Sequence, residues 1–398
     1  MSSSPRVAYI QNVLRETPEL DGWLFYDFRG SDPLAYRILQ IDRTRHVTRR
    51  WYYWIPAQGE PAKLIHRIEP HALDGLPGEA ILYVSWDEQR ACLARTLTGA
   101  RRVAMQYSPM NAIPYISRVD AGTIELIRSF SIDVATSADL VQRFEAVLSD
   151  HQAASHQDAA EKLRRIVDEA FNYVRRHIAA RNPLNEYALQ QFILSRVQTQ
   201  GLITSSPPIV AVNAHSADPH YAPGSNGSAE IMPDDLLLID LWAKRPEVGS
   251  VYADITWTGT VARQAPTHQQ EIFEIVRDAR DTALDFVRTR IGSGDLPRGW
   301  EVDEVCRHVI RQAGYGERFL HRTGHSIGEE VHGNGANLDG LETRDERRLL
   351  PNTCFSIEPG IYLSGQFGIR SELDVYVTDR EAVVFGTPLQ TEIVPILK

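Results

Sequence analysis

The sequence predicts two domains of different fold class, an α/β domain over residues 1–150 and an α+β domain over residues 151–398. At 398 residues and 43% hydrophobic composition, the chain is long enough to bury two cores. Strand-like and helix-like segments alternate in the first part, whereas amphipathic helices flank strand segments in the second. Apolar periodicity lapses between Val147 and Asp158, and this lapse marks the predicted boundary.

The first domain alternates short helical segments with aromatic-rich strand segments. Arg6 to Arg15 carries apolar residues at helical spacing, and Asp87 to Thr98 is a second predicted helix. The predicted strands share aromatic or β-branched side chains and are bounded by turn residues, and they lie at residues 21–28, 49–56, 62–68, 79–86 and 101–107. This alternation predicts a sheet with helices packed against it.

The second domain contains four predicted amphipathic helices with apolar residues at three- and four-residue intervals. They cover Ala159 to Ala180, Asn185 to Gln200, His268 to Arg290 and Glu301 to Ala313. Strand-like segments fall between and after them, at residues 207–214, 235–243, 250–262, 353–363, 369–378 and 381–386. Helices that flank several antiparallel strands are typical of an α+β domain.

Charge and cysteine content exclude several classes of protein. The net charge of −10, without a run of basic residues, argues against a nucleic-acid or anionic-membrane partner. Cys92, Cys306 and Cys354 lie far apart with no CxxC pair, which predicts neither a disulfide framework nor a thiolate zinc site and fits a reducing, cytoplasmic environment. The N-terminal residues lack a signal-peptide core, and no window approaches eighteen uninterrupted apolar residues.

Four acidic residues lie inside apolar, strand-like segments: Asp240, Asp254, Glu358 and Glu372. A buried carboxylate is costly unless it meets a cation or hydrogen-bond donors. Each acid alone is commonly a surface residue or half of a salt bridge, but four together with a histidine form a different pattern. Hard oxygen ligands with one imidazole suit a pair of divalent ions such as Mn²⁺, Co²⁺, Fe²⁺ or Zn²⁺.

The densest group of histidines in the chain lies in HRTGHSIGEEVH, where His321, His325 and His332 recur at intervals of four and seven residues. Gly324 and Gly328 let the backbone pack closely beside these rings. The segment is therefore a second candidate for a functional role beside the four acids.

These residues, in this order, resemble the ligand set of the metallopeptidase family with the pita-bread fold, which includes aminopeptidase P, prolidase and methionine aminopeptidase. The matching positions are Asp240, Asp254, His325 within GHSIG, Glu358 within IEPGIY, and Glu372 within GIRSE. The resemblance extends from about residue 159 to the C-terminus. The presence of a domain before it resembles the creatinase, prolidase and aminopeptidase P branch. It disfavours methionine aminopeptidase, which typically lacks such a domain.

The resemblance implies a creatinase-like N-terminal domain over residues 1–150 and a pita-bread catalytic domain over 151–398. It also implies a dinuclear-metal-dependent Xaa-Pro peptidase of prolidase or aminopeptidase P type, acting through a metal-bridging hydroxide. Asp254 and Glu372 would bridge two metal ions, with Mn²⁺ expected and Co²⁺, Fe²⁺ or Zn²⁺ as alternatives. Asp240 would complete the coordination of one ion, and His325 with Glu358 would complete that of the other.

Further residues acquire expected roles from the same resemblance. Glu358 would carry a proton to the leaving amine, while His220 and His332 would stabilise the oxyanion or bind the substrate carbonyl. His321 and Arg370 would contact the substrate or support the ligands. Arg344, in the charged run LETRDERR, would hold the free carboxylate of a dipeptide.

The expected partner is a proline-containing dipeptide or short peptide, and the resemblance implies a homodimer. Three function classes stay open: the Xaa-Pro peptidase, another small-metabolite enzyme on the same fold, and a metal-free binding protein. The second class includes metal-free hydrolysis of the creatinase type and a metal-dependent lyase. The complete ligand set argues against the metal-free options, because four buried acids would repel one another.

Overall fold

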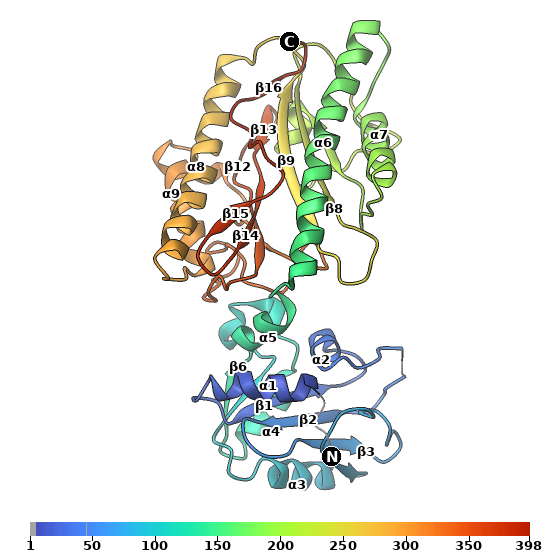
Figure 1. Cartoon of the computed structure of the whole chain (residues 1–398), viewed down its shortest axis with the longest axis vertical. Helices are drawn as coiled ribbons and strands as arrows, with labels where there is room; N and C mark the ends of the chain where they lie inside the picture. The colour runs from blue at the N-terminus through green and yellow to red at the C-terminus, as the bar shows by residue number, and fades with distance from the viewer. Residues whose placement is uncertain (1–4, 45) are drawn as a thin grey trace. The chain divides into compact units, whose positions relative to one another are not determined.

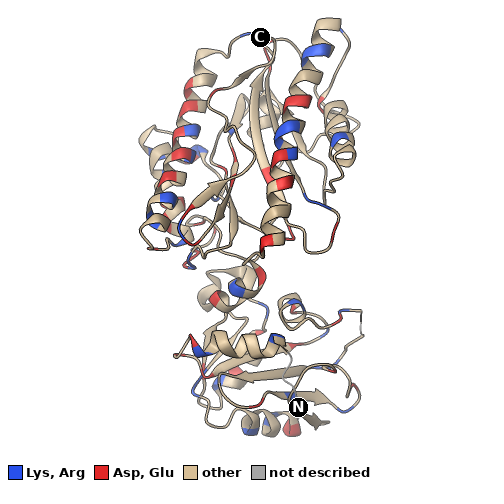
Figure 2. Cartoon of the chain, viewed as in Figure 1, with Lys and Arg blue, Asp and Glu red and all other residues tan. Residues whose placement is uncertain are grey.

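The computed structural model describes residues 5–44 and 46–398, which fall into two compact units, Met1–Glu145 and Ala146–Lys398 (Figure 1). Within the described residues, no helix is long and apolar enough to cross a bilayer. Figure 2 shows acidic and basic residues interspersed along the long helices of the second unit.

The first unit is built on a six-stranded sheet within the described residues, with the order β4-β3-β2-β1-β5-β6. Its strands are β1 (Gly22–Asp27), β2 (Trp51–Pro56), β3 (Ala62–His66), β4 (Glu79–Tyr83), β5 (Arg102–Met105) and β6 (Asp133–Thr136). β2 is antiparallel to both β1 and β3, whereas β3 pairs with β4, β1 with β5 and β5 with β6 in parallel. The predicted α/β character of this part is therefore confirmed.

Helices cover both faces of this sheet. They are α1 (Pro5–Arg15), α2 (Pro33–Leu39), α3 (Trp86–Thr96), α4 (Ala121–Arg128) and α5 (Ala138–Glu145), with 3₁₀ turns η1 (Pro109–Asn111) and η2 (Pro114–Ile116). Because strand side chains alternate, Trp23 of β1 packs with α1, α2 and α5, whereas Leu24 packs with α3 and α4. The sequence predicted α1 and α3 but missed α2, α4 and α5, which are too short for a clear helical period.

The second unit contains two four-stranded sheets and a two-stranded hairpin within the described residues. One sheet has the order β16-β9-β8-β7, and its strands are β7 (Ile209–Val212), β8 (Leu236–Ala243), β9 (Ala253–Thr260) and β16 (Val394–Pro395). The other has the order β10-β11-β14-β15, and its strands are β10 (Ser326–Ile327), β11 (Cys354–Ile357), β14 (Leu373–Val377) and β15 (Ala382–Val384). The hairpin joins β12 (Gly360–Leu363) to β13 (Phe367–Arg370).

Two pairs of helices flank these strands, α6 with α7 and α8 with α9 (Figure 1). Their bounds, with those of the 3₁₀ turns, are α6 (Asp150–Ala180), α7 (Glu186–Thr199), α8 (Thr267–Gly292), α9 (Gly299–Gln312), η3 (Asn213–Ala217) and η4 (Gly316–Arg318). The expected start of α6 near Ala159 is wrong. Ser149 and Gln152 form a capping box that starts the helix at Asp150, before its apolar periodicity begins.

Two predicted strands are each interrupted in the middle. Residues 353–363 form β11 and β12 with a break at Glu358-Pro359, and residues 369–378 form β13 and β14 with a break at Ser371-Glu372. Proline has no backbone N–H to donate to a neighbouring strand, so Pro359 favours the first break. Both breaks fall at an acid that the sequence analysis selected.

Gly324 provides the closest backbone approach beside these strands. A Cβ atom at this position would lie 1.9 Å from the carbonyl oxygen of Ser356 on β11. We therefore expect Gly324→Ala to lower the free energy of unfolding by about 3 kcal/mol or more, because neither backbone segment is free to move away. Chemical denaturation measures this change.

The matched control is Gly292→Ala at the end of α8, where the nearest atom to an added Cβ lies 4.0 Å away. The control should change stability by less than about 1 kcal/mol. Equal stabilities of the two variants would contradict the packing argument.

Candidate metal centre

The register of β8 and β9 places two of the selected acids on one face of their sheet. Asp240 pairs with Thr256, and Trp242 pairs with Asp254. Side chains two residues apart on a strand point to the same side, and paired residues share a side. Asp240 and Asp254 are therefore diagonal neighbours on one face.

The second sheet contributes the other two acids. Ser356 of β11 pairs with Asp374 of β14, and Ile357 pairs with Leu373. Continuing this register by one residue brings Glu358 opposite Glu372, just where both strands are interrupted. The two sheets of the unit thus direct two carboxylates each towards a common region.

Hydrogen bonds between β9 and β14 hold the two sheets together at this region. The backbone N–H of Asp254 donates to Asp374 Oδ2 at 2.7 Å, and Thr256 Oγ1 donates to Glu372 Oε2 at 2.7 Å. The backbone N–H of Glu372 donates to the carbonyl oxygen of Thr256 at 3.2 Å. These contacts set the separation of Asp254 and Glu372 through backbone as well as side-chain atoms.

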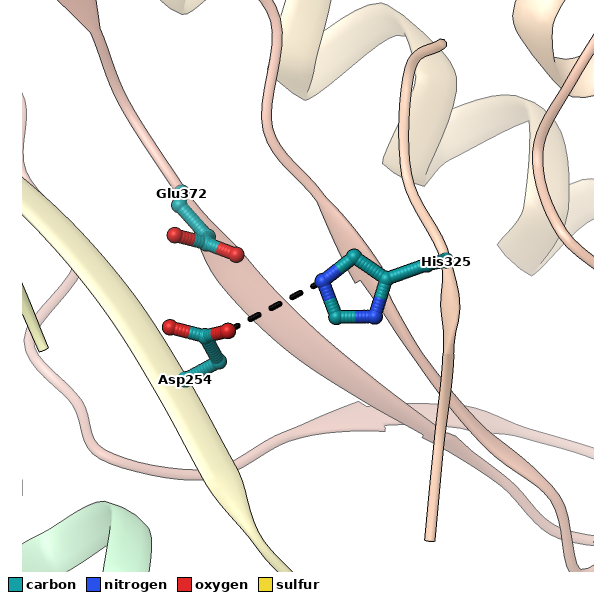
Figure 3. A group of neighbouring side chains, drawn as sticks. All are labelled: Asp254, His325 and Glu372. Carbon is teal, nitrogen blue, oxygen red and sulfur yellow. Dashed lines mark ion pairs between the residues drawn. The ribbon is translucent and has the colours of Figure 1, made fainter. Parts of the chain in front are cut away.

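Asp254, His325 and Glu372 each place one ligand atom within 4.8 Å of the others (Figure 3). The two carboxylates lie side by side and face the imidazole edge, and His325 Nε2 is 3.8 Å from Asp254 Oδ2. His325 Nε2 also lies 3.4 Å from Glu358 Oε1, which accepts a hydrogen bond from Ser356 Oγ. His325 directly precedes β10 and Glu358 directly follows β11, so residues in or next to four strands, β9, β10, β11 and β14, meet here.

Asp240 forms an ion pair with the side chain of Arg370. Arg370 Nη2 donates to Asp240 Oδ2 at 2.5 Å, and Arg370 Nε donates to Thr256 Oγ1 at 3.1 Å. Both charged side chains are almost fully buried. Arg370 therefore orients Asp240 and, through Thr256, supports Glu372.

A chain of hydrogen bonds continues from Arg370 to His321. Arg370 Nη1 donates to Tyr362 Oη at 2.9 Å, and Tyr362 Oη lies 2.7 Å from His321 Nε2. His321 Nδ1 faces the carbonyl oxygen of Arg322 at 2.8 Å and must carry the proton there. Nε2 is then the acceptor of the Tyr362 hydroxyl, because burial lowers the pKa of His321 to about 3 and keeps the ring neutral.

Burial and mutual repulsion shift the pKa values of the clustered acids. Burial, followed by the charge of Asp240, raises the pKa of Asp254 well above its usual value. Burial and Asp254 do the same for the pKa of Glu372, and burial raises the pKa of Glu358 to about 7. Burial lowers the pKa of His325 well below 6.5. The cluster therefore resists full ionisation of its acids without added positive charge.

Several buried oxygen atoms of this cluster have no hydrogen-bond partner within residues 5–44 and 46–398. They are Asp240 Oδ1, Asp254 Oδ1 and Glu372 Oε1. Buried polar atoms are nearly always paired, and an unpaired carboxylate oxygen is costly. Carboxylate oxygens with one neutral imidazole are a donor set that fits divalent metal ions.

Of the other predicted residues, His332 lies beside the metal centre, whereas His220 and Arg344 are exposed. The His332 ring centroid lies 4.3 Å from that of His325, so His332 belongs to the same region. His220 is exposed on the loop after η3, where its backbone N–H donates to Asp218. Arg344 is also exposed, pairing with Glu346 at 2.7 Å and stacking 4.2 Å from the Trp300 ring centroid.

Sequence reasoning missed three residues that support the acids: Thr256, Tyr362 and Asp374. Thr256 lies two residues after Asp254, and Asp374 two residues after Glu372, so strand periodicity could have found both. Tyr362 ends the motif IEPGIY, but no local pattern indicates its contact with Arg370 and His321. Such contacts depend on pairing between distant strands.

Comparison with known proteins gives a family match. The sequence pattern of metallopeptidase family M24 matches residues 155–379. An Xaa-Pro dipeptidase of Lactobacillus delbrueckii subsp. lactis is 35% identical over 215 residues, which are 53% of this chain and 54% of that enzyme. An Xaa-Pro dipeptidase of Lactobacillus helveticus is 30% identical over 273 residues, which are 67% of each chain. The first match thus spans only about half of the relative's length.

A solved structure shares the fold over almost the whole chain. The dipeptidase PepE from Mycobacterium ulcerans superimposes with a TM-score of 0.66 at 22% identity, covering 98% of this chain and 97% of that one. The predicted fold class, an α/β N-terminal domain followed by a pita-bread domain, is therefore confirmed.

The raised pKa of Glu358 predicts a pH-dependent effect of Glu358→Gln on the metal-stripped protein. A carboxyl group whose pKa is raised in the folded state contributes its full stability at pH values below its pKa in the unfolded state. This contribution is lost as pH rises through its pKa in the folded state. For Glu358 the window runs from 4.5 to about 7. Relative to wild type, the variant should gain stability across this window, by on the order of 3 kcal/mol. Denaturation between about pH 5 and about pH 8 measures the difference.

The control is Glu161→Gln, an exposed residue of α6, which should show no such trend. The neutral, buried His156 and His321 have lowered pKa values and act in the opposite direction, but equally in all three proteins. A constant difference between Glu358→Gln and wild type across the window would contradict the prediction.

Proposed function

Because the chain belongs to metallopeptidase family M24, we propose that it is a metal-dependent Xaa-Pro peptidase, which hydrolyses the peptide bond before proline. The observation that carries the proposal is the buried group Asp254, His325 and Glu372, whose ligand atoms lie within 4.8 Å of one another inside the matched region. The names of the two Xaa-Pro dipeptidase relatives support the substrate class.

We propose that five residues hold two divalent ions, with Mn²⁺ expected. Asp254 and Glu372 would bridge the ions, Asp240 would complete one, and His325 with Glu358 would complete the other. When bound, such ions supply Lewis-acid activation of water and of the substrate carbonyl. The unpaired oxygens of Asp240, Asp254 and Glu372 support this assignment, because each has a lone pair left for a ligand bond.

Glu358 is the proposed proton carrier. It would take the proton of the attacking water and deliver it to the nitrogen of the leaving proline. Its position supports this role, because the carboxylate adjoins His325 and retains partial access to solvent, with 16% of its side chain exposed. A carboxyl with a pKa of about 7 in the metal-free protein is able to release and regain a proton near neutral pH.

Three histidines are proposed to act on the substrate. His332, beside His325, and His220 would donate hydrogen bonds to the substrate carbonyl and to the oxyanion that forms from it. His321 would contact the substrate or support the site through Tyr362 and Arg370. Arg370 supports Asp240 directly, which favours its supporting role over direct substrate contact.

The substrate is proposed to be a proline-containing dipeptide or short peptide, with cleavage of prolidase or aminopeptidase P type. The homodimer, which the family resemblance implies, and the cytoplasmic location, which the cysteine content suggests, remain predictions. Light scattering at micromolar concentration measures the first, and a monomer would contradict it.

Peptide hydrolysis by metal-stripped and metal-resupplied protein tests the function. We expect the stripped protein to be inactive and Mn²⁺, Co²⁺, Fe²⁺ or Zn²⁺ to restore cleavage of Gly-Pro, Gly-Pro-Pro or a longer Xaa-Pro peptide. Glu358→Gln should lower kcat by at least about a hundredfold even where metal is retained, because an amide cannot carry the proton. Elemental analysis reports the retained metal.

Full activity in protein with only trace metal would contradict the proposed chemistry. Metal binding without hydrolysis of any of these peptides would favour another small-metabolite enzyme on the same fold. The matched control is Glu161→Gln, which should retain wild-type kcat and metal content.

Arg344 distinguishes dipeptides from longer substrates. If its guanidinium holds the free carboxylate of a dipeptide, Arg344→Ala should raise KM for Gly-Pro by about ten- to a hundredfold, the loss of one charge-assisted hydrogen bond. Longer peptides should be little affected. The exposed Arg311→Ala on α9 is the control, and identical dipeptide kinetics of both variants and wild type would assign Arg344 to the surface.

A further inference from the structure

The first unit contains a cavity of about 850 Å³ that is separate in sequence from every residue of the metal centre. Its floor includes the rings of Tyr26 and Tyr52, whose centroids are 5.1 Å apart. Its rim includes Phe28 and Trp86, which are 39% and 59% exposed. Its volume lies in the range of small-molecule sites, and large exposed aromatic rings at a cavity commonly mark binding surfaces.

The cavity lies at a particular place in the sheet. From β1 the chain builds outwards through β2, β3 and β4, and then crosses back to add β5 and β6 on the other side of β1. Phe28 follows the carboxyl end of β1, Trp86 follows β4, and Arg118 lies in the connection after β5. In open α/β sheets, ligands bind outside the carboxyl ends of the strands where the strand order reverses. The cavity occupies this position, beside β1 and β5.

Three arginines converge on the cavity: Arg50, Arg90 and Arg118. In the described part of the chain, none of them forms an ion pair with a carboxylate, whereas Arg37 and Arg102 of the same unit pair with acids at 2.6 Å and 3.3 Å. Three positive charges that share a cavity without a direct ion pair favour an anionic ligand.

Two acids also line the cavity, Asp120 and Glu125. The Asp120 carboxylate is engaged in capping α4, where it accepts hydrogen bonds from the backbone N–H and the hydroxyl of Thr123. These hydrogen bonds hold the carboxylate against α4 and not against an arginine, while its negative charge remains in the lining. Three arginines against two acids leave the lining with an excess of one positive charge.

Two of the arginines lie over the exposed rings. The Arg90 guanidinium lies 4.7 Å from the Trp86 ring centroid, and the Arg50 guanidinium lies 5.7 Å from that of Phe28. A stacked guanidinium keeps its edge N–H groups available for a carboxylate or phosphate. Each pair thus offers a flat apolar surface beside a fork of hydrogen-bond donors.

We propose that this cavity binds a small organic anion that carries a flat aromatic or heterocyclic ring. The ring would stack among Trp86, Phe28 and the tyrosines, and the anionic group would be held by Arg50, Arg90 and Arg118. A nucleoside monophosphate and an aromatic carboxylate share this chemistry. The inference is independent of the proposed peptidase activity.

Calorimetric titration of the full, metal-loaded chain tests the proposal. The probes are adenosine 5′-monophosphate and indole-3-acetate, with uncharged adenosine and indole as their matched controls. We expect at least one anion to bind with a Kd below about 1 mM and its uncharged counterpart to bind at least about tenfold more weakly. The better of the two anions identifies the preferred acidic group.

Substitutions locate the binding. Arg90→Gln and Trp86→Ala should each raise the Kd of the bound anion by about tenfold or more, whereas Arg95→Gln should leave it unchanged. Arg95 is the matched control, because it lies exposed on the same helix but outside the lining. Should Trp86→Ala fail to fold, Arg90→Gln decides the question alone.

The proposal is overturned if neither anion binds at concentrations up to about 10 mM, or if the uncharged probes bind as tightly. It is also overturned if Arg90→Gln binds the anion as wild type does. Peptidase activity has no part in these measurements, so failure of the proposed function would not affect them.

Discussion

The crowding of like charges inside one protein core is the constraint on which the second unit depends. Asp240 and Asp254 lie in apolar strands and Glu358 and Glu372 at strand breaks, and burial together with neighbouring carboxylates raises the pKa values of Asp254, Glu358 and Glu372. Arg370 is the buried cation that pairs with one of them, Asp240. The remaining charge calls for cations from outside the chain, which is why a metal centre is the natural interpretation of this arrangement.

Backbone and side-chain hydrogen bonds hold these acids in place. Asp254 and Glu372 are fixed by hydrogen bonds that link β9 to β14. His156 of α6 adds a further contact, because its Nδ1 donates to the carbonyl oxygen of Tyr252 at 2.7 Å, two residues before Asp254. Helix and both sheets thus position the same short stretch of β9. A rigid scaffold of this kind keeps ligand atoms close despite their repulsion.

The two units use helices and strands in different arrangements. In the first, aromatic residues of alternating orientation bury both faces of a mainly parallel sheet, and the reversal of strand order leaves a crevice at its carboxyl edge. In the second, antiparallel strands bury one polar region between two sheets. Positive side chains gather at the crevice of the first unit, and negative ones at the centre of the second.

By itself, the sequence determined the fold class and identified the acids in apolar segments that need a cation or hydrogen-bond donors. Helical and strand periods are local properties, and an acid in an apolar strand is visible without any structure. The capping box that starts α6 at Asp150 was also present in the sequence, as Ser149 and Gln152, but periodicity alone did not reveal it. Only the tertiary structure decided that two predicted strands break at Glu358 and Glu372, that Arg370 pairs with Asp240 across 130 residues, and that Arg50, Arg90 and Arg118 meet at one cavity. These features depend on which strands pair and in which register, and such long-range pairing is set by the packing of the whole core rather than by any local stretch of residues.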